Sequence, residues 1–586
     1  MLDVVIRGGE VVDGTGTPRQ RGDVGVRDGR IVAVGQVDEP ARRVVDADGL
    51  VVSPGFIDPH THYDAQVFWD PHLTPSCLHG VTTMLAGNCG FTIAPMEDQH
   101  ADYIRRMLAV VEGMPLAALE AGPTWDWRSY AEWLAAVEAS GPAVNVGFGV
   151  GHSTIRRMVM GEASHEPTAT PEQVTAMVRL VHESIEAGAL AFTTSLSTAH
   201  HDGDGRPVPS FAASLDELVA LSTAVRAHPG TTLGLSPPIG VWETPILELL
   251  TAMSRAADRP LFWNALIIDA DNPEQTWSQM AAGDHSRARG GAVVAETIPD
   301  LMSMRLSFET GFVLAAIPGW GEVLALPHGE RLEALADTSV RARLRASYEA
   351  MPDSSLKRVM KTEDIRLGEA TSPGTERFAH RLVGEVASEL GVDPFDAMLD
   401  VIVANDLRTP IWPRAVGDDD ETWQLRSELW QDPRVVFGGG DGGAHLDLAS
   451  TYQYFTALLG PHVRDKHLMS LEQAVHLMTG EPASAFGLTG RGVVAPGAHA
   501  DLTLFDPDTI GPGDLHLRPD LPSGAERLYS VATGITSVLV EGVEVVHDGL
   551  LVGNRPGRVL KAGIDTHTVT CADYWRKADE RAHKGE

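Results

Sequence analysis

Residues 55–64 have the sequence GFIDPHTHYD and follow the apolar run Leu50-Val51-Val52 and a Ser-Pro turn. Phe56-Ile57 is typical of the short buried core of a strand. His60 and His62 lie two residues apart, so both imidazoles leave the same face of an extended backbone. A catalytic zinc site commonly has three protein ligands, and this pair supplies two of them. The stretch therefore predicts a strand that ends in a metal site.

Strand-like and helix-like segments alternate from residue 53 to about residue 315, and one more strand follows far downstream. The expected strands, in chain order, are 56–57, 81–85, 144–150, 190–195, 232–236, 260–266, 292–296 and 435–439. Repeated strand–helix units with strands this apolar predict a parallel barrel. The expected fold class is therefore α/β, with a (β/α)8 TIM barrel whose catalytic groups lie at the carboxyl ends of the strands.

The two ends of the chain share a different, hairpin-rich pattern. Residues 3–52 predict strands joined by turns at Gly8-Gly9 and Asp28-Gly29, and similar strands recur at 500–506 and 535–546. Either sheet would be marginal alone. We expect one small β-sandwich built from both termini, with the barrel inserted between its halves; two separate β modules are the alternative.

The expected boundaries follow from these patterns. The sandwich halves are 1–52 and 486–560, the barrel is 53–485, and 561–586 is a tail without a recognisable pattern. A charged, helical insertion near 310–430 interrupts the barrel between its seventh and eighth strands. Such an insertion is expected to lie over the barrel mouth and to shape a substrate pocket.

Composition limits the partners. The chain has 586 residues, which is typical of more than one domain, and a net charge of 46 − 80 = −34. This charge argues against nucleic acid and anionic membranes as partners. No signal peptide or membrane span is recognisable and three cysteines are too few for a disulfide framework, so a cytoplasmic protein is expected. Whether the chain forms a homo-oligomer stays open.

Four motifs together resemble one superfamily. They are GFIDPHTHYD at 55–64, GNCGF at 87–91, GHSTIR at 151–156 and GDG at 440–442. The set is similar to the signatures of the metal-dependent amidohydrolases, in particular the N-acyl-D-amino-acid deacylases (D-aminoacylases). The resemblance extends from Asp3 to about Val559 and is weakest from 310 to 430.

The resemblance implies a site and a reaction. It implies zinc ligation by His60, His62, Asp441 and Cys89, and hydrolysis of a small-molecule amide by metal-activated water, with Asp441 as the base. The other two cysteines, Cys77 and Cys571, are interpreted as structural.

Further polar residues follow the expected strands. His152, Asn264 and His445 are candidates for contacting the substrate or supporting the ligands. His200-His201 and the following Asp202–Gly205 are interpreted as an exposed polar loop.

Two positions depart from the D-aminoacylase pattern, which has metal-ligand histidines on the fifth and sixth strands. Here those strands end near Ser236 and Asn264. We therefore expect one tightly bound Zn²⁺ and, at most, a weakly bound second ion. The fourth strand ends in Thr193-Thr194-Ser195 without a lysine, so no carbamylated lysine is expected to bridge two ions.

Three functions remain open on the sequence. The first is a D-aminoacylase-like amide hydrolase. The second is a cyclic-amide hydrolase of the hydantoinase and dihydroorotase kind, against which the missing lysine counts. The third is a metal-free, non-catalytic barrel, which the histidine pair and Asp441 oppose. Metal analysis and product analysis on acyclic and cyclic amides would separate them.

Overall fold

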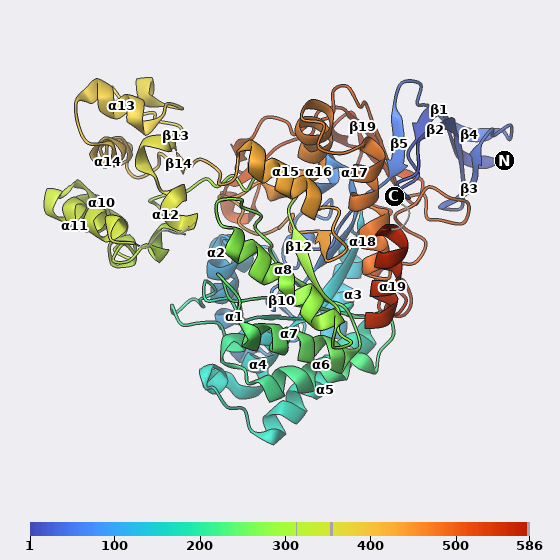
Figure 1. Ribbon diagram of the computed structural model, residues 1–586, viewed down its shortest axis with the longest axis horizontal. Helices are drawn as coiled ribbons and strands as arrows, with labels where there is room; N and C mark the ends of the chain where they lie inside the picture. Colours follow the sequence, from blue (N-terminus) through green and yellow to red (C-terminus); the bar gives the residue numbers. More distant parts are fainter. Residues whose placement is uncertain (312, 352–354, 583–586) are drawn as a thin grey trace. The chain divides into compact units, whose positions relative to one another are not determined.

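The computed structural model describes residues 1–311, 313–351 and 355–582 (Figure 1). It divides into two compact units, each treated by itself. The barrel unit comprises Met1–Asp300, Asp420–Leu446 and Thr451–Glu586. The inserted unit comprises Leu301–Asp419 and Asp447–Ser450.

A parallel barrel forms the centre of the barrel unit, as predicted. In the described chain its eight strands pair in the order β15-β12-β11-β10-β9-β8-β7-β6. They are β6 (Phe56–Asp58), β7 (Val81–Ala86), β8 (Asn145–Gly151), β9 (Ala191–Ser195), β10 (Thr232–Ser236), β11 (Leu261–Trp263), β12 (Val293–Thr297) and β15 (Val435–Phe437). The loops after the first and last strands close the ring: Asp441 donates its backbone N–H to His60 O at 3.1 Å, and His62 donates to Gly442 O at 2.7 Å.

Helices follow the strands around the barrel (Figure 1). They are α1 (Asp98–Val111), α2 (Leu116–Ala121), α3 (Tyr130–Ser140), α4 (His152–Met160), α5 (Pro171–Ala187), α6 (Leu215–Arg226), α7 (Thr244–Ala257), α8 (Pro273–Arg287), α15 (Asp420–Leu429), α16 (Tyr454–Ala457), α17 (Leu471–Met478) and α18 (Gly480–Ala485). Local signals set their starts; α5 begins at Pro171 behind a capping box of Thr170 and Gln173. None of the helices in the described ranges is long and apolar enough to span a membrane.

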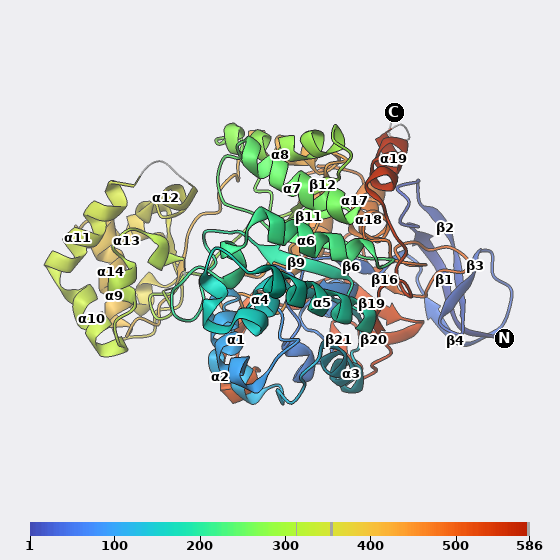
Figure 2. The same ribbon diagram turned by 90° about the horizontal axis from the view of Figure 1, so that it is seen from below.

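Strands from both ends of the chain share one sheet, as the sequence predicts (Figure 2). The strand order in the described chain is β21-β20-β19-β16-β5-β1-β2-β3, with β4 also paired to β1. The strands are β1 (Leu2–Val11), β2 (Gln20–Arg27), β3 (Arg30–Gly35), β4 (Ala41–Asp46), β5 (Val51–Pro54), β16 (Leu502–Phe505), β19 (Ile535–Val540), β20 (Val543–His547) and β21 (Leu550–Leu551). The antiparallel pair β5–β16 joins the amino-terminal strands of this sheet to the carboxyl-terminal strands. From β5 the chain continues directly into the first barrel strand.

The predicted turn at Gly8-Gly9 is wrong, whereas the turn at Asp28-Gly29 is confirmed. Residues Leu2–Val11 form one strand whose register shifts between Ile6 and Gly9, so the glycines lie in a bulge. Gly8 has φ +69°, and a Cβ on Gly9 would lie 2.5 Å from a methyl group of Val52. Glycine is thus required here for a bulge and a close strand contact, and these give the same sequence signal as a turn.

The insertion folds around a core of its own. Its elements are α9 (Gly321–Leu324), α10 (His328–Ala336), α11 (Thr338–Glu349), α12 (Ser355–Val359), α13 (Val383–Leu390), α14 (Pro394–Ala404), β13 (Arg366–Leu367) and β14 (Ile411–Trp412). The buried rings of Trp320 and Phe395 pack edge to face at 5.7 Å within this core. The helical character of the segment agrees with the sequence, and its expected place over the barrel mouth stays a prediction.

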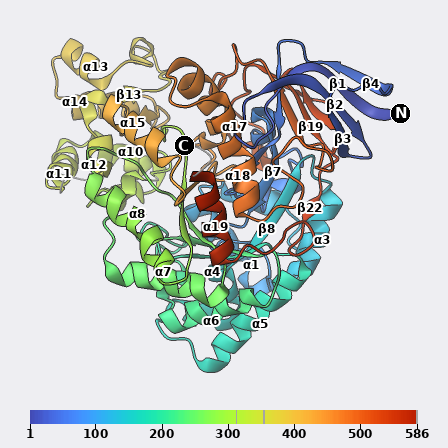
Figure 3. The same ribbon diagram turned by 45° about the vertical axis from the view of Figure 1, so that its right-hand side comes forward.

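The tail, for which the sequence offered no pattern, contains α19 (Cys571–Ala582). Trp575 donates its indole N–H to Gly291 O at 2.8 Å, and Tyr574 donates to Pro433 O at 3.0 Å. These carbonyls precede β12 and β15, so the helix packs at the amino-terminal end of the barrel. Figure 3 shows α19 beside α18, with which it shares a hydrophobic cluster.

Candidate metal centre

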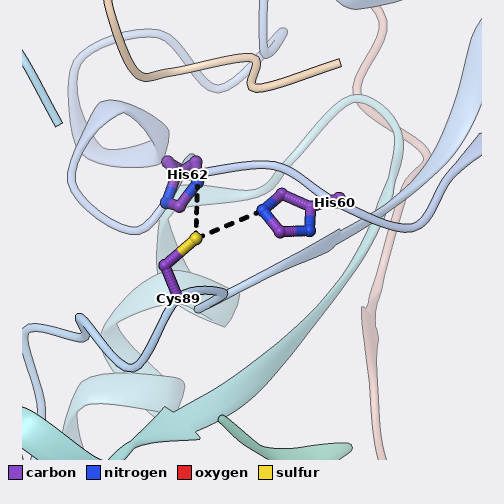
Figure 4. A group of neighbouring side chains, drawn as sticks. All are labelled: His60, His62 and Cys89. Atoms are coloured by element: carbon purple, nitrogen blue, oxygen red, sulfur yellow. Dashed lines mark hydrogen bonds between the residues drawn. The ribbon is translucent and has the colours of Figure 1, made fainter. Parts of the chain in front are cut away.

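Four predicted ligands meet at the carboxyl end of the barrel. His60 and His62 follow β6, Cys89 follows β7 and Asp441 follows β15. Cys89 Sγ lies 3.4 Å from His60 Nε2 and 4.0 Å from His62 Nε2 (Figure 4). Asp441 Oδ1 lies 3.7 Å and 3.6 Å from the same two nitrogens. Both imidazoles therefore present Nε2 to a thiol and a carboxylate at once.

This donor set fits a metal ion. Among the described residues, His60, His62 and Cys89 form a buried group whose donor atoms all lie within 4.8 Å of one another. Zn–N bonds of about 2.0–2.1 Å and Zn–S bonds of about 2.3 Å place tetrahedral ligand atoms roughly 3.3–3.6 Å apart. Three of the four distances to Cys89 and Asp441 are 3.4–3.7 Å and the fourth, between Cys89 and His62, is 4.0 Å, so these donor pairs have nearly the spacing of zinc ligands.

A buried glutamate lies behind each histidine, on the side of the ring that faces away from Cys89 and Asp441. Glu296 Oε2 lies 2.7 Å from His60 Nδ1, and Glu112 Oε1 lies 3.3 Å from His62 Nδ1. A carboxylate at Nδ1 fixes the proton there and leaves Nε2 free to bind a metal. Sequence reasoning missed both. Glu296 could have been noticed as an acid near the end of an apolar strand, whereas Glu112 follows α1 without any signal.

The centre stabilises charge on each of its members. Burial opposes protonation of His60 and His62, but Glu296, Glu112 and Cys89 outweigh it and raise both pKa values well above the ordinary range. Burial opposes ionisation of Cys89, yet the histidines lower its pKa to about 6. Asp441 likewise has a lowered pKa, because His62 and His60 outweigh its burial. The metal-free centre thus favours protonated imidazoles, and a metal ion, which binds the neutral ring at Nε2, would compete with these protons.

The backbone of the centre lies in an unusual region. Cys89 has φ +56°, Asp441 +46° and His445 +49°. Such left-handed residues cluster at functional sites, where the surrounding structure holds them. The glycines beside Asp441 are needed for space: a Cβ on Gly440 would lie 1.9 Å from Asp58 Oδ2, and one on Gly442 would lie 2.6 Å from the Tyr63 hydroxyl.

The fifth and sixth strands contribute neutral groups. Ser236 ends β10 and Asn264 follows β11. Asn264 donates its side-chain N–H to Cys89 Sγ at 3.5 Å, and Ser236 donates its hydroxyl to Asn264 Oδ1 at 3.1 Å. Asn264 also lines a pocket inside the barrel together with His60, Cys89 and Glu296.

His152 and His445 have different surroundings. His152 is fully buried, with Nδ1 2.9 Å from Thr194 Oγ1 and Nε2 2.9 Å from Glu217 Oε1. Both of its ring nitrogens are thus occupied, and its predicted role toward substrate stays a prediction. His445 donates its backbone N–H to Glu112 O at 2.5 Å, which ties the loop after β15 to the glutamate behind His62. Burial lowers the pKa of His445 although the charge of Asp441 opposes this.

The prediction of an exposed polar loop at His200–Gly205 is wrong at its start. Asp202 is buried and accepts hydrogen bonds from the Tyr103 hydroxyl and from two backbone N–H groups of its own loop. His200 Nδ1 lies 2.7 Å from Ser195 Oγ, and its ring packs on Phe91, 5.2 Å away. Burial and the charges of His445 and His62 lower the pKa of His200 to about 3. A polar composition alone did not reveal that this loop turns inward.

A family model described as the amidohydrolase family matches residues 43–546. The chain belongs to this family. It is a hydrolase that acts on carbon–nitrogen bonds other than peptide bonds, which confirms the resemblance drawn from the motifs.

Amidohydrolases that act on D-amino-acid derivatives are similar over the whole chain. The D-aminoacylase of Alcaligenes xylosoxydans xylosoxydans is 29% identical, over 95% of this chain and 97% of that protein. A D-aminoacylase crystal structure is 26% identical with a TM-score of 0.63, over 96% of this chain and 100% of that one. N-acyl-D-glutamate deacylase from Bordetella bronchiseptica, solved with zinc and a phosphonate inhibitor, is 28% identical with a TM-score of 0.63 and the same coverage.

Proposed function

We propose that this amidohydrolase is a zinc-dependent deacylase that hydrolyses the amide bond of N-acyl-D-amino acids or closely similar acyclic amides. The observation that carries the proposal is the convergence of four donor atoms, from His60, His62, Cys89 and Asp441, at the carboxyl end of the barrel. Whole-length similarity to a D-aminoacylase and to a deacylase solved with zinc supports both the ion and the substrate class.

His60, His62, Asp441 and Cys89 would hold a single tightly bound zinc ion. When bound, such an ion polarises a carbonyl group and makes water a stronger nucleophile at neutral pH. Ser236 and Asn264 offer only neutral oxygen and nitrogen atoms, which are poor zinc ligands beside imidazole and thiolate. A second ion is therefore expected to bind weakly.

The chain's own residues supply orientation and proton transfer. Glu296 accepts a hydrogen bond from His60 Nδ1, and Glu112 lies 3.3 Å from His62 Nδ1, so both glutamates help to keep the Nε2 atoms directed at the centre. The Asp441 carboxylate accepts a proton from the attacking water and passes it to the nitrogen of the leaving amine. His62 and His60 lower the pKa of Asp441, which favours the ionised form that can accept a proton.

Substrate profiling of the zinc-loaded protein tests this function. We expect release of a free amine from N-acetyl-D-amino acids, a smaller rate on the L-enantiomers, loss of turnover with a chelator and recovery with added zinc. Hydrolysis of hydantoins and dihydropyrimidines alone would replace the proposal with the cyclic-amide function. Purified protein without bound metal, and with the same behaviour in chelator, would contradict the metal-dependent function altogether.

A further inference from the structure

Within the part of the chain that the structure describes, the Cys89 sulfur has hydrogen-bond contacts with His60, with His62 and with one neutral group, the side-chain amide of Asn264. Asn264, at the end of the sixth strand, places its side-chain amide 3.5 Å from Cys89 Sγ. We infer that Asn264 is a positioning residue for Cys89, directing its sulfur toward His60 and His62. This inference rests on the proposed function, since it assumes that the centre holds an ion.

The backbone of Cys89 is already fixed on both sides. Gly90 donates its backbone N–H to Thr193 Oγ1 at 3.2 Å. On the other side, the side-chain amide of Asn88 donates to Thr61 O at 3.3 Å and to Leu85 O at 3.1 Å. The remaining freedom of Cys89 is rotation of its side chain. The hydrogen bond from Asn264 restricts this rotation.

Ser236 contacts the other end of the Asn264 amide. Its hydroxyl donates to Asn264 Oδ1 at 3.1 Å while the amide nitrogen faces the sulfur. The flipped amide would place Oδ1 against an electron-rich thiolate, which accepts hydrogen bonds but donates none. The chain Ser236–Asn264–Cys89 thus links the ends of β10 and β11 to the loop after β7.

A neutral donor suits this position better than a cation. His60 and His62 already lie 3.4 Å and 4.0 Å from the sulfur, so a further cationic side chain would add positive charge beside the position of the metal ion. An amide N–H orients the sulfur without competing with a cationic metal ion for the site. Groups that orient ligands in this way typically change metal affinity by about 10–100-fold when removed.

The test measures zinc affinity by chelator competition and the thiolate-to-metal charge-transfer band of the cobalt(II)-loaded protein. We expect Asn264→Ala to raise the Kd for zinc about 10–100-fold and to move the band to lower energy, because a thiolate without its hydrogen bond is a stronger electron donor. Ser236→Ala should act in the same direction and less strongly. The double variant should have the same zinc Kd and the same band energy as Asn264→Ala, because both substitutions act through the hydrogen bond from Asn264 to Cys89.

Two controls make the result specific. Cys89→Ala should remove the band. Asn145→Ala removes an amide that bonds to Thr82 O and Asp501 at the other end of β8, and it should leave the band and the zinc Kd unchanged. Unchanged band and Kd in Asn264→Ala, with or without a loss of turnover, would overturn the positioning role while leaving the proposed function intact. Wild-type protein that binds neither zinc nor cobalt would overturn both.

Discussion

The two sides of the barrel mouth differ in the kind of side chain that they present. The ligand side, formed by the ends of β15, β6 and β7, carries Asp441, His60, His62 and Cys89. The neutral side, formed by the ends of β10 and β11, carries Ser236 and Asn264. Both sides direct polar groups at the same point, because strand ends of a parallel barrel meet at one rim. The residue type at a strand end therefore decides whether its side chain binds the metal ion or orients another side chain that binds it.

The largest expected effect on the ligand side is the loss of the base. Asp441→Asn should lower turnover by about 10²–10⁴-fold or more, because it removes proton transfer and also a ligand charge. Steady-state kinetics on the best amide substrate measures this, with circular dichroism as the control for folding. Turnover close to that of the wild type would remove Asp441 from the mechanism.

The number of zinc ions retained per chain tests the contribution of the individual ligands. Wild-type protein is expected to retain one zinc ion per chain after dialysis. His60→Ala should lose that ion, whereas Cys89→Ala should retain more of it, because His60, His62 and Asp441 are expected to form the tight site and Cys89 to be an additional ligand. Elemental analysis of the dialysed proteins decides between these outcomes. Two retained ions in the wild type would show that further ligands exist.

The glutamates behind the histidines should matter less than the ligands. Glu296→Gln keeps the size of the side chain but removes the charge at His60 Nδ1, and we expect the zinc Kd to rise about 10–100-fold. Glu217→Gln is the matched control, because Glu217 bonds to His152 and Arg156. Zinc competition on both variants is the measurement. Equal affinities would show that Glu296 does not support the centre.

The smallest expected effect is a twofold rise in the number of bound zinc ions when histidines replace the neutral residues at the ends of β10 and β11. The double variant Ser236→His and Asn264→His places two imidazoles beside the Cys89 sulfur. We expect two ions per chain after loading and gentle dialysis, with the first ion retained. A count that stays at one, in a folded variant, would show that residue type alone does not separate the two sides.

Much of the fold could be predicted because its signals are local. The eight apolar strand segments agree with the observed strands to within a few residues, and the shared sheet of both termini follows from similar hairpin patterns. The predicted turn at Gly8-Gly9 was wrong because a bulge and a turn both need residues without a Cβ. The helix in the tail could not be predicted, because α19 is stabilised by packing at the amino-terminal end of the barrel. There Trp575 and Tyr574 donate hydrogen bonds to carbonyl groups that are distant in the chain.

The sequence by itself determined the ligand candidates, since spacing places His60 and His62 on one face and glycines allow Asp441 its tight turn. It also determined that the fifth and sixth strands end without histidine. Only the tertiary structure decided that Glu296 and Glu112 lie behind those histidines, that His200 turns inward and that Asn264 reaches Cys89. These contacts join residues far apart in the chain, and closure of the barrel, which no local pattern encodes, brings them within hydrogen-bonding distance.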